Sequence, residues 1–166
     1  MTVISTAPAV KAAVAARLAA DALIGGAGVQ VTHGHPHPVV PASELVHVGK
    51  TRSVSRVGDR YQGGQTPRQL GRDGREERYT ITLTVSVVGN ETDAYAVLEA
   101  RAYAIADLVD ASLRAWRSTT PSAFGGVCRW AIVTGVEDDE ALDLGRGREA
   151  RVEIELSVAA AIEPST

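Results

Sequence analysis

Apolar residues recur at helical spacing near the start of the chain. Val10, Val14 and Leu18 stand four residues apart in an Ala-rich segment, which places them on one face of a helix. Ser5 and Thr6 precede it and offer hydroxyl side chains that can cap free amides, and the glycines at 25 and 26 are suited to end it. We therefore predict an amphipathic first helix that stops before these glycines.

A second, longer helix is predicted from about Asp93 to Trp116. Asn90 to Asp93 supply capping side chains and negative charge suited to a helix start. The apolar positions then step by three or four, as one buried face requires. They are Tyr95, Leu98, Ala102, Ile105, Val109, Leu113 and Trp116.

Alternation with a period of two identifies the strands. From Tyr79 to Val87 every second residue is apolar and the residues between are Thr or Ser, a pattern typical of a strand. Residues 151–158 alternate in the same way. Shorter or less regular strands are predicted at 29–32, 44–57 and 127–136. The predicted order is α-β-β-β-α-β-β.

Residues 58–74 contain five glycines and Pro67 and show no sustained hydrophobic period. This pattern favours a long, basic, Gly-rich exposed loop. Such loops are uncommon in compact domains and usually have a function or are disordered. We interpret the segment as a partner-binding arm that becomes ordered on assembly. The residues assigned to this arm are Arg56, Arg60, Tyr61, Arg68, Arg72 and Arg75.

Two helices packed on one face of a mainly antiparallel sheet would bury both helical stripes and the alternating strand faces. The sequence therefore predicts an α+β fold. A chain of 166 residues is long enough for one hydrophobic core and too short for two independent ones. We assign residues 1–162 to a single domain and residues 163–166 to a flexible C-terminal tail.

Composition narrows the class of protein. Hydrophobic residues make up 45% and charged residues 22%, as in ordinary globular proteins. A single cysteine, Cys128, excludes an intrachain disulfide and a zinc site built from cysteines. No stretch approaches the ~20 apolar residues that span a bilayer, so we expect cytoplasmic synthesis and no membrane partner.

Charge is distributed unevenly along the chain. Residues 50–75 contain seven basic and two acidic residues, a net charge of +5, which leaves −8 for the remainder of the total of −3. Such a protein can present a basic surface to one partner and an acidic surface to another. The acidic run, which we interpret as a solvated hairpin tip or an electrostatic contact, consists of Glu137, Asp138, Asp139, Glu140 and Asp143.

Three histidines form the most suggestive chemical motif. His33, His35 and His37 alternate, so their imidazoles would share one side of an extended segment and could bind a transition metal, with His47 as a fourth ligand. The intervening glycine and prolines favour a solvated surface loop instead. We expect no metal and no cofactor.

Other candidates for chemistry are weaker. Cys128 lies in a predicted strand, where a buried structural cysteine is commoner than a nucleophile. The acidic run lacks the spacing and central glycine of a calcium loop, and no serine lies in a nucleophile-elbow motif. We predict that the chain is not an enzyme.

The arginines of residues 50–75 would neutralise phosphates regardless of sequence. Only Tyr61 lies among them, so the stacking platform of a single-strand binder is missing. A protein-binding or solvated loop is the simpler interpretation.

Three segments resemble the tail terminator and head-tail joining proteins of long-tailed bacteriophages. They are residues 78–85, the long helix from Asp93 to Leu113, and the terminal alternating segment 151–158. The resemblance rests on their order, together with the amphipathic first helix and the basic Gly-rich loop, and covers most of the chain. It includes no invariant motif.

This resemblance implies a structural virion protein at the tail-head junction, synthesised in the host bacterial cytoplasm. It implies a homohexameric ring that caps the tail tube and contacts the tail-tube protein and a head-completion or neck protein. Genome DNA would pass through its lumen without specific binding, and the acidic run would line this lumen or an interface. Another head-tail connector or neck component is an alternative. A small α+β dimer that binds nucleic acid or an anionic ligand, and a histidine-dependent metalloenzyme, are further alternatives.

Overall fold

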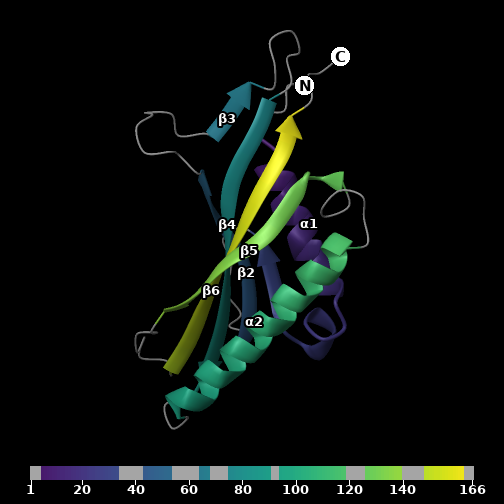
Figure 1. Ribbon diagram of the computed structural model, residues 1–166. Coiled ribbons are helices and arrows are strands. Elements are labelled where there is room, and N and C mark those ends of the chain that lie inside the picture. The colour runs from purple at the N-terminus through teal and green to yellow at the C-terminus, as the bar shows by residue number, and fades with distance from the viewer. Residues whose placement is uncertain are drawn as a thin grey trace.

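The computed structural model describes residues 5–33, 43–53, 64–67, 75–90, 94–118, 126–139 and 148–162. In these residues two long helices lie on one face of a twisted, six-stranded sheet (Figure 1). The α+β class and the packing of both helices on one face, predicted from the sequence, are therefore confirmed.

Eight main elements follow one another along the described residues, with a 3₁₀ turn η1 (Gly25–Ala27) after the first helix. The predicted order is reproduced, except for one additional short strand, Gly64–Pro67, between the second and third predicted strands. The elements are α1 (Ala7–Ala20), β1 (Gln30–His33), β2 (Glu44–Ser53), β3 (Gly64–Pro67), β4 (Arg75–Gly89), α2 (Tyr95–Ser118), β5 (Trp130–Asp139) and β6 (Arg148–Ile162).

The centre of the sheet is an antiparallel ladder between β4 and β6. Its register runs without interruption from Arg75 opposite Ile162 to Gly89 opposite Arg148. The sheet order is β1-β2-β4-β6-β5, with β3 also paired to β4. β1 and β2 are parallel and the other described pairs are antiparallel. β1 and β5 therefore form the two lateral edges.

Alternation along the central strands produces one buried face, which packs against the helices. On β4 this face consists of Tyr79, Ile81, Leu83, Val85 and Val87, all at most 4% exposed. Val152, Ile154, Leu156 and Val158 occupy the same face of β6. The helical stripes predicted from the sequence complete this core, because Val10, Val14, Leu18, Leu98, Ala102, Ile105, Val109 and Leu113 belong to the same buried cluster.

The start of α1 is fixed by a carboxylate on the sheet together with one of the two predicted hydroxyl caps, that of Ser5. The Thr6 side chain caps no helix amide; its hydroxyl and its backbone N–H both donate to Glu77 Oε2, at 2.9 and 2.8 Å. Ser5 donates to Glu77 Oε1 and also accepts from the Ala7 N–H. Glu77 is buried, so its partners must satisfy it, and they tie α1 to β4.

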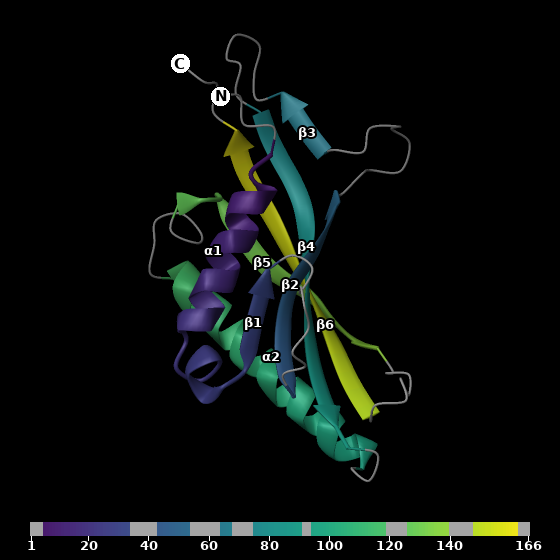
Figure 2. The same cartoon turned by 180° about the vertical axis from the view of Figure 1, so that it is seen from behind.

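Polar contacts also fix the other ends of the helices. Arg101 of α2 donates two hydrogen bonds to Glu44 of β2, at 2.7 and 2.8 Å, and this contact lowers the pKa of Glu44. Ser112 of α2 donates to Asp21 at the end of α1 and lowers the pKa of that carboxyl. Figure 2 shows α1 and β1 lying together on the side away from β5.

The segment 58–74, expected to be one long loop, includes the short strand β3. β2 ends at Ser53 opposite Tyr79, so the first residues of β4 would otherwise have an unpaired edge. Gly64–Pro67 pair with Arg78–Arg75 along that edge. A proline is compatible with this position because β3 lies at the sheet edge. The other residues of the segment, and the predicted tail 163–166, lie outside the described residues.

We expect the Glu77→Gln variant to be less stable than the wild type. The amide cannot accept all the hydrogen bonds that the buried carboxylate now accepts, and hydrogen bonds to charged groups contribute about 2 kcal/mol each. Urea denaturation should show a free energy of unfolding lower by about 2 kcal/mol. Glu153→Gln, the same change outside this cluster, is the control; an equal loss in both variants would contradict the anchoring role.

Candidate assembly interface

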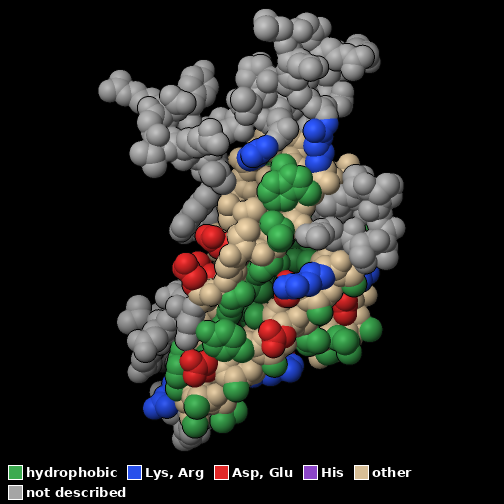
Figure 3. All heavy atoms as spheres, in the orientation of Figure 1, with side chains coloured by type: hydrophobic (Ala, Val, Ile, Leu, Met, Phe, Trp, Pro, Cys, Tyr) green, Lys and Arg blue, Asp and Glu red, His purple; other side chains and the backbone are tan. Residues whose placement is uncertain are grey.

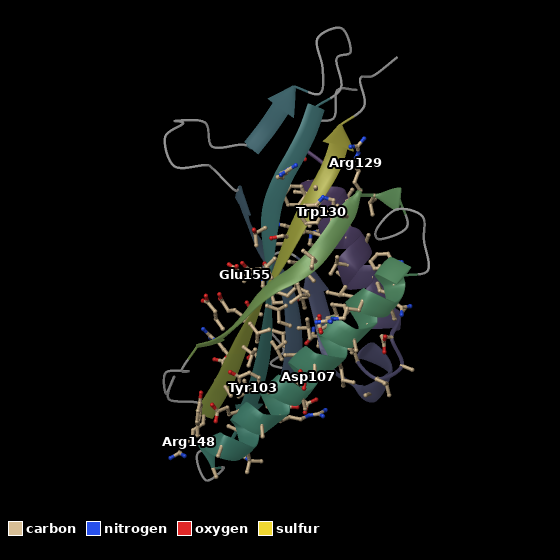
Figure 4. All side chains as sticks on the ribbon, viewed as in Figure 1. Tyr103, Asp107, Arg129, Trp130, Arg148 and Glu155 are labelled. Carbon is tan, nitrogen blue, oxygen red and sulfur yellow. The ribbon has the colours of Figure 1, made fainter. Side chains whose placement is uncertain are left out.

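The edge strand β5 exposes an unusual number of large hydrophobic side chains. Trp130 is 43% exposed, Ile132 46% and Val136 49%, and Tyr103 on α2 is 38% exposed. We call these four residues the β5 patch. In Figure 3 hydrophobic side chains run along β5 towards α2. Figure 4 shows Trp130 near the start of β5 and Tyr103 on the helix beside it.

A β-bulge explains why the patch continues around the edge of the sheet. Ile132 lies opposite Ser157 on the face without helices, whereas Val136 lies opposite Ile154 on the helix face. The register shifts between Val133 and Gly135, which leaves Thr134 as the extra residue. One inserted residue reverses the alternation of everything after it. Apolar side chains of one strand are therefore presented on both sides of its free edge.

Thr134 holds this bulge in place. Its hydroxyl lies 3.3 Å from Ser157 Oγ and 3.4 Å from the backbone oxygen of Glu155. Gly135 lies against the Glu155 side chain, where an added Cβ would stand 3.8 Å from Oε2. A glycine inside a strand often marks such a bulge, and Gly135 is the sequence signal that would have located this one.

The register also brings three carboxylates together on the face without helices. Glu137 lies opposite Glu153 in the ladder, and Glu155 lies two residues further along β6. We call these residues the acidic group. Glu137 belongs to the predicted acidic run, whereas Glu153 and Glu155 were not selected from the sequence because they are far from it along the chain. Their partners across β4 are the uncharged Thr84 and Thr82.

The same face is basic at its other end. Arg78, Ala159 and Trp130 lie side by side in one row of the ladder, and Arg129 precedes Trp130. Figure 3 shows basic side chains on both sides of an aromatic one in this region. Thr84 of β4 lies in the same row as Glu153 and Glu137, and Arg78 lies six residues before it. The basic and acidic rows are therefore about 20 Å apart. Charge on this face is thus separated along the strands.

The basic segment 50–75 and the acidic run also lie near opposite ends of the ladder. The ends of the basic segment that the structure describes, at Ser53, Gly64–Pro67 and Arg75, lie beside the start of β4. The acidic run leaves β5 at Asp139, which pairs with Arg151 near the start of β6. Eleven residues of β6 separate that level from Ile162, or about 36 Å. Arg56, Arg60, Tyr61, Arg68, Arg72, Glu140 and Asp143 lie outside the described residues.

An ion pair between the buried Glu149 and the partly exposed Arg151 lies at the acidic end of the ladder. Arg151 donates two hydrogen bonds of 2.8 Å to Glu149, and Ser86 donates a third. Burial acts to raise the pKa of Glu149, but the hydrogen bonds from Arg151 and Ser86 outweigh it and the pKa is lowered. The carboxylate is therefore ionised at neutral pH, and its charge is balanced by Arg151.

The histidines are not brought together as a metal site in the described residues. Thr32 Oγ1 is 3.1 Å from His47 Nδ1, and Thr32 lies opposite His47 in the parallel pair. His33 is the next residue of β1 and so faces the other side of the sheet. His33 and His47 therefore point to opposite faces of the sheet. His35 and His37 lie outside the described residues, within which no metal-binding group of side chains is found.

Cys128 is a buried structural residue, as predicted. It is 4% exposed, and burial raises the pKa of its thiol to about 11. The thiol is therefore protonated at neutral pH and is a poor nucleophile. Among the described helices, none combines the length and apolar composition needed to span a bilayer.

Comparison with known proteins relates the fold to one type of particle. The chain matches no protein-family model and no curated protein sequence. Its fold is similar to that of a chain in the virion of a native gene transfer agent (GTA) particle, with a TM-score of 0.65 and 15% sequence identity. The similarity covers 96% of this chain and 99% of the other, so the whole fold is shared.

We expect acid to destabilise the wild type more than the Glu149→Gln variant. The folded pKa of Glu149 is below its ordinary value of 4.5. Its ionised form therefore stabilises the fold above that value, and this stabilisation is lost as pH falls through the lower, folded pKa. Free energies of unfolding, measured in urea between about pH 6 and pH 3, should fall less steeply in the variant.

Two serine variants separate this effect from a general acid response. Ser86→Ala removes one donor to Glu149 and should give a slope between those of the wild type and Glu149→Gln. Ser157→Ala removes a hydroxyl elsewhere on the same face and should keep the wild-type slope. Equal slopes in all four proteins would show that Glu149 contributes nothing to the pH dependence.

Proposed function

We propose that this chain is a structural virion protein, a tail terminator. It forms a ring that caps the tail tube and joins it to the head-completion or neck proteins. The observation that carries this proposal is the similarity, over nearly the whole length of both chains, to a component of a GTA virion. At this identity the likeness concerns the fold, and two features of this chain's own surface support the function.

The β5 patch supports an assembly role. Free edge strands with exposed apolar side chains pair readily with other chains, and soluble proteins normally protect them with charge, bulges or covering segments. Here the bulge at Thr134 presents Ile132 and Val136 on both sides of the edge. Such an edge is suited to be covered by another protein.

The separation of charge along β4 and β6 supports a position between two different partners. A ring in the neck has one surface towards the tube and one towards the head. The acidic run and the basic segment leave the ladder near its opposite ends. Each end can therefore attract a partner of opposite charge and repel the other.

The acidic group suits a channel through which DNA passes. Glu137, Glu153 and Glu155 lie with Thr82 and Thr84 on the face without helices. Carboxylates repel phosphates, and the uncharged hydroxyl groups offer no counter-charge that would retain them. We propose that this face lines the lumen, which accounts for passage of a genome without specific binding.

The proposal is tested by mixing the purified chain with the tail-tube protein of the same particle. Addition to growing tubes should stop their elongation and leave a hexameric ring at one end, visible by electron microscopy and by light scattering. A chain that leaves tube length unchanged but binds a neck protein would favour another connector. A stable dimer indifferent to both proteins would favour the ligand-binding alternative.

We also expect that changing the acidic group will create DNA binding that the wild type lacks. In the triple variant Glu137→Lys, Glu153→Lys and Glu155→Lys, three repulsive charges become three phosphate contacts. Fluorescence anisotropy with labelled duplex DNA should show binding that weakens steeply with salt, with a slope of about −3 in log K against log salt. The triple Gln variant, which removes charge without reversing it, is the control.

Wild-type binding to DNA with a comparable salt slope would contradict a lumen role for this face. It would instead support the alternative in which the chain holds nucleic acid.

A further inference from the structure

Helix α1 has an exposed face without a single charged side chain. Its buried stripe of Ala7, Val10, Val14 and Leu18 faces the sheet. The opposite side is formed by residues that are all small and apolar, and Leu23, 63% exposed, extends it beyond the helix end. We call this surface the alanine face. It consists of Pro8, Ala9, Ala12, Ala16, Ala19, Ala20 and Leu23.

A surface helix normally places charged and polar residues opposite its buried stripe, and a helix that is apolar all round is normally buried. In α1 the two charged residues, Lys11 and Arg17, lie at intermediate exposure on the flanks. Asp21 accepts hydrogen bonds from Ser112 and from the Leu23 N–H, at 2.6 and 3.0 Å. The turn that exposes Leu23 is therefore fixed and not frayed.

The β5 patch and the alanine face lie at opposite lateral ends of the molecule. α1 packs on β1 and β2, whereas β5 is the far edge of the sheet. Figures 1 and 2 show them on opposite sides, with β5 in front in one view and α1 in front in the other. Within one copy these two surfaces cannot meet, but between copies they can.

The two surfaces are complementary in shape and size. The β5 patch presents bulky side chains, and the alanine face is smooth enough to let another backbone approach closely. Seven residues of strand from Trp130 to Val136 span about 20 Å. Twelve residues of helix from Ala9 to Ala20 span about 17 Å, so the two surfaces are similar in length.

They are also complementary in charge. The flanks of the alanine face are basic, at Lys11 and Arg17. Asp107, which is exposed, lies one helical turn from Tyr103 beside the β5 patch, and Arg129 lies at its other end beside Trp130. Opposite charges around an apolar contact favour the correct partner and orientation more than they add affinity.

We propose that the β5 patch of one copy packs on the alanine face of α1 in a second copy of this chain. The contact joins two different surfaces, so it is head-to-tail and leaves a free surface of each kind. Repeated with a rotation that closes, such a contact generates a ring. The inference rests on the proposed function in one respect, because a terminator ring requires a contact of this type.

The test uses one charged substitution in each surface of the full-length chain. Ile132→Lys alters the β5 patch and Ala16→Lys alters the alanine face, and each should weaken self-association at least tenfold. Size exclusion with light scattering should give a ring for the wild type and monomers for each variant alone. Ala111→Lys, an exposed alanine of α2, is the matched control and should keep the wild-type mass.

Mixing the two variants separates a head-to-tail contact from other arrangements. The Ile132→Lys chain retains its alanine face and the Ala16→Lys chain retains its β5 patch, so one intact contact can form. The mixture should therefore give a heterodimer that does not grow further. Ile132→Thr keeps a branched strand residue and should show the same defect more weakly, while circular dichroism verifies that every variant is folded.

Three results would overturn the inference. Loss of assembly in Ile132→Lys but not in Ala16→Lys would indicate patch-to-patch pairing. A ring that persists in both variants would place the contact elsewhere and leave the terminator proposal intact. A wild-type chain that stays monomeric at every concentration would exclude the contact in the free protein, while the tube-capping experiment would still decide the proposed function.

Discussion

The antiparallel pairing of β4 with β6 is the constraint on which the rest of this structure depends. These two strands are paired along their whole length without a shift in register, and every other strand except β1 pairs with one of them. The buried faces of both strands also form the floor on which α2 packs, whereas α1 packs on β1 and β2 beside them. A change of one residue in this register would turn the apolar side chains of one strand to the opposite face.

The length of this ladder determines what its ends and edges can do. Fifteen residues of strand extend for about 45 Å, longer than the strands beside it. The extra length of β4 leaves room for β3, and it separates the acidic and basic segments by most of the length of the molecule. Its two sides differ as well, because β2 and β1 continue the sheet on one side and β5 ends it on the other. The molecule therefore has distinct ends and distinct edges, as a subunit that meets several different neighbours requires.

Much of the fold could be predicted from the sequence because its core obeys simple periodicity. The stripe from Leu98 to Leu113 and the alternation from Tyr79 to Val87 correspond to the buried faces of α2 and β4. Features that depend on distant residues could not be predicted. The anchor for α1 is Glu77, about seventy residues away, and Thr6 alone gave no sign of it. β3 forms because β4 offers it an edge, and neither its short length nor its composition indicates a strand.

The candidate interface was harder to predict than the fold because one inserted residue, Thr134, decides which side chains of β5 lie on which face. Residues 127–136 alternate well enough to predict a strand, and simple alternation places Trp130, Ile132 and Val136 on the same face. The shift at Thr134 moves Val136 to the helix face and brings Glu137 opposite Glu153 on the other. The apolar patch and the acidic group thus have a common origin in the bulge. A single inserted residue in an edge strand determines which side chains lie on the helix face and which lie on the face without helices.

The alanine-rich first helix illustrates a related limit. Its sequence indicated amphipathicity through Val10, Val14 and Leu18, which is correct for the side that faces the sheet. The other side could not be recognised as a possible contact surface, because alanine is the best helix former and is common on helix surfaces. Helix propensity alone, however, does not explain why Lys and Glu, which form helices nearly as well and favour water, are absent from every fully exposed position of α1. The proposed burial of this face against a second copy would explain it, because a charged side chain there would be desolvated without a partner.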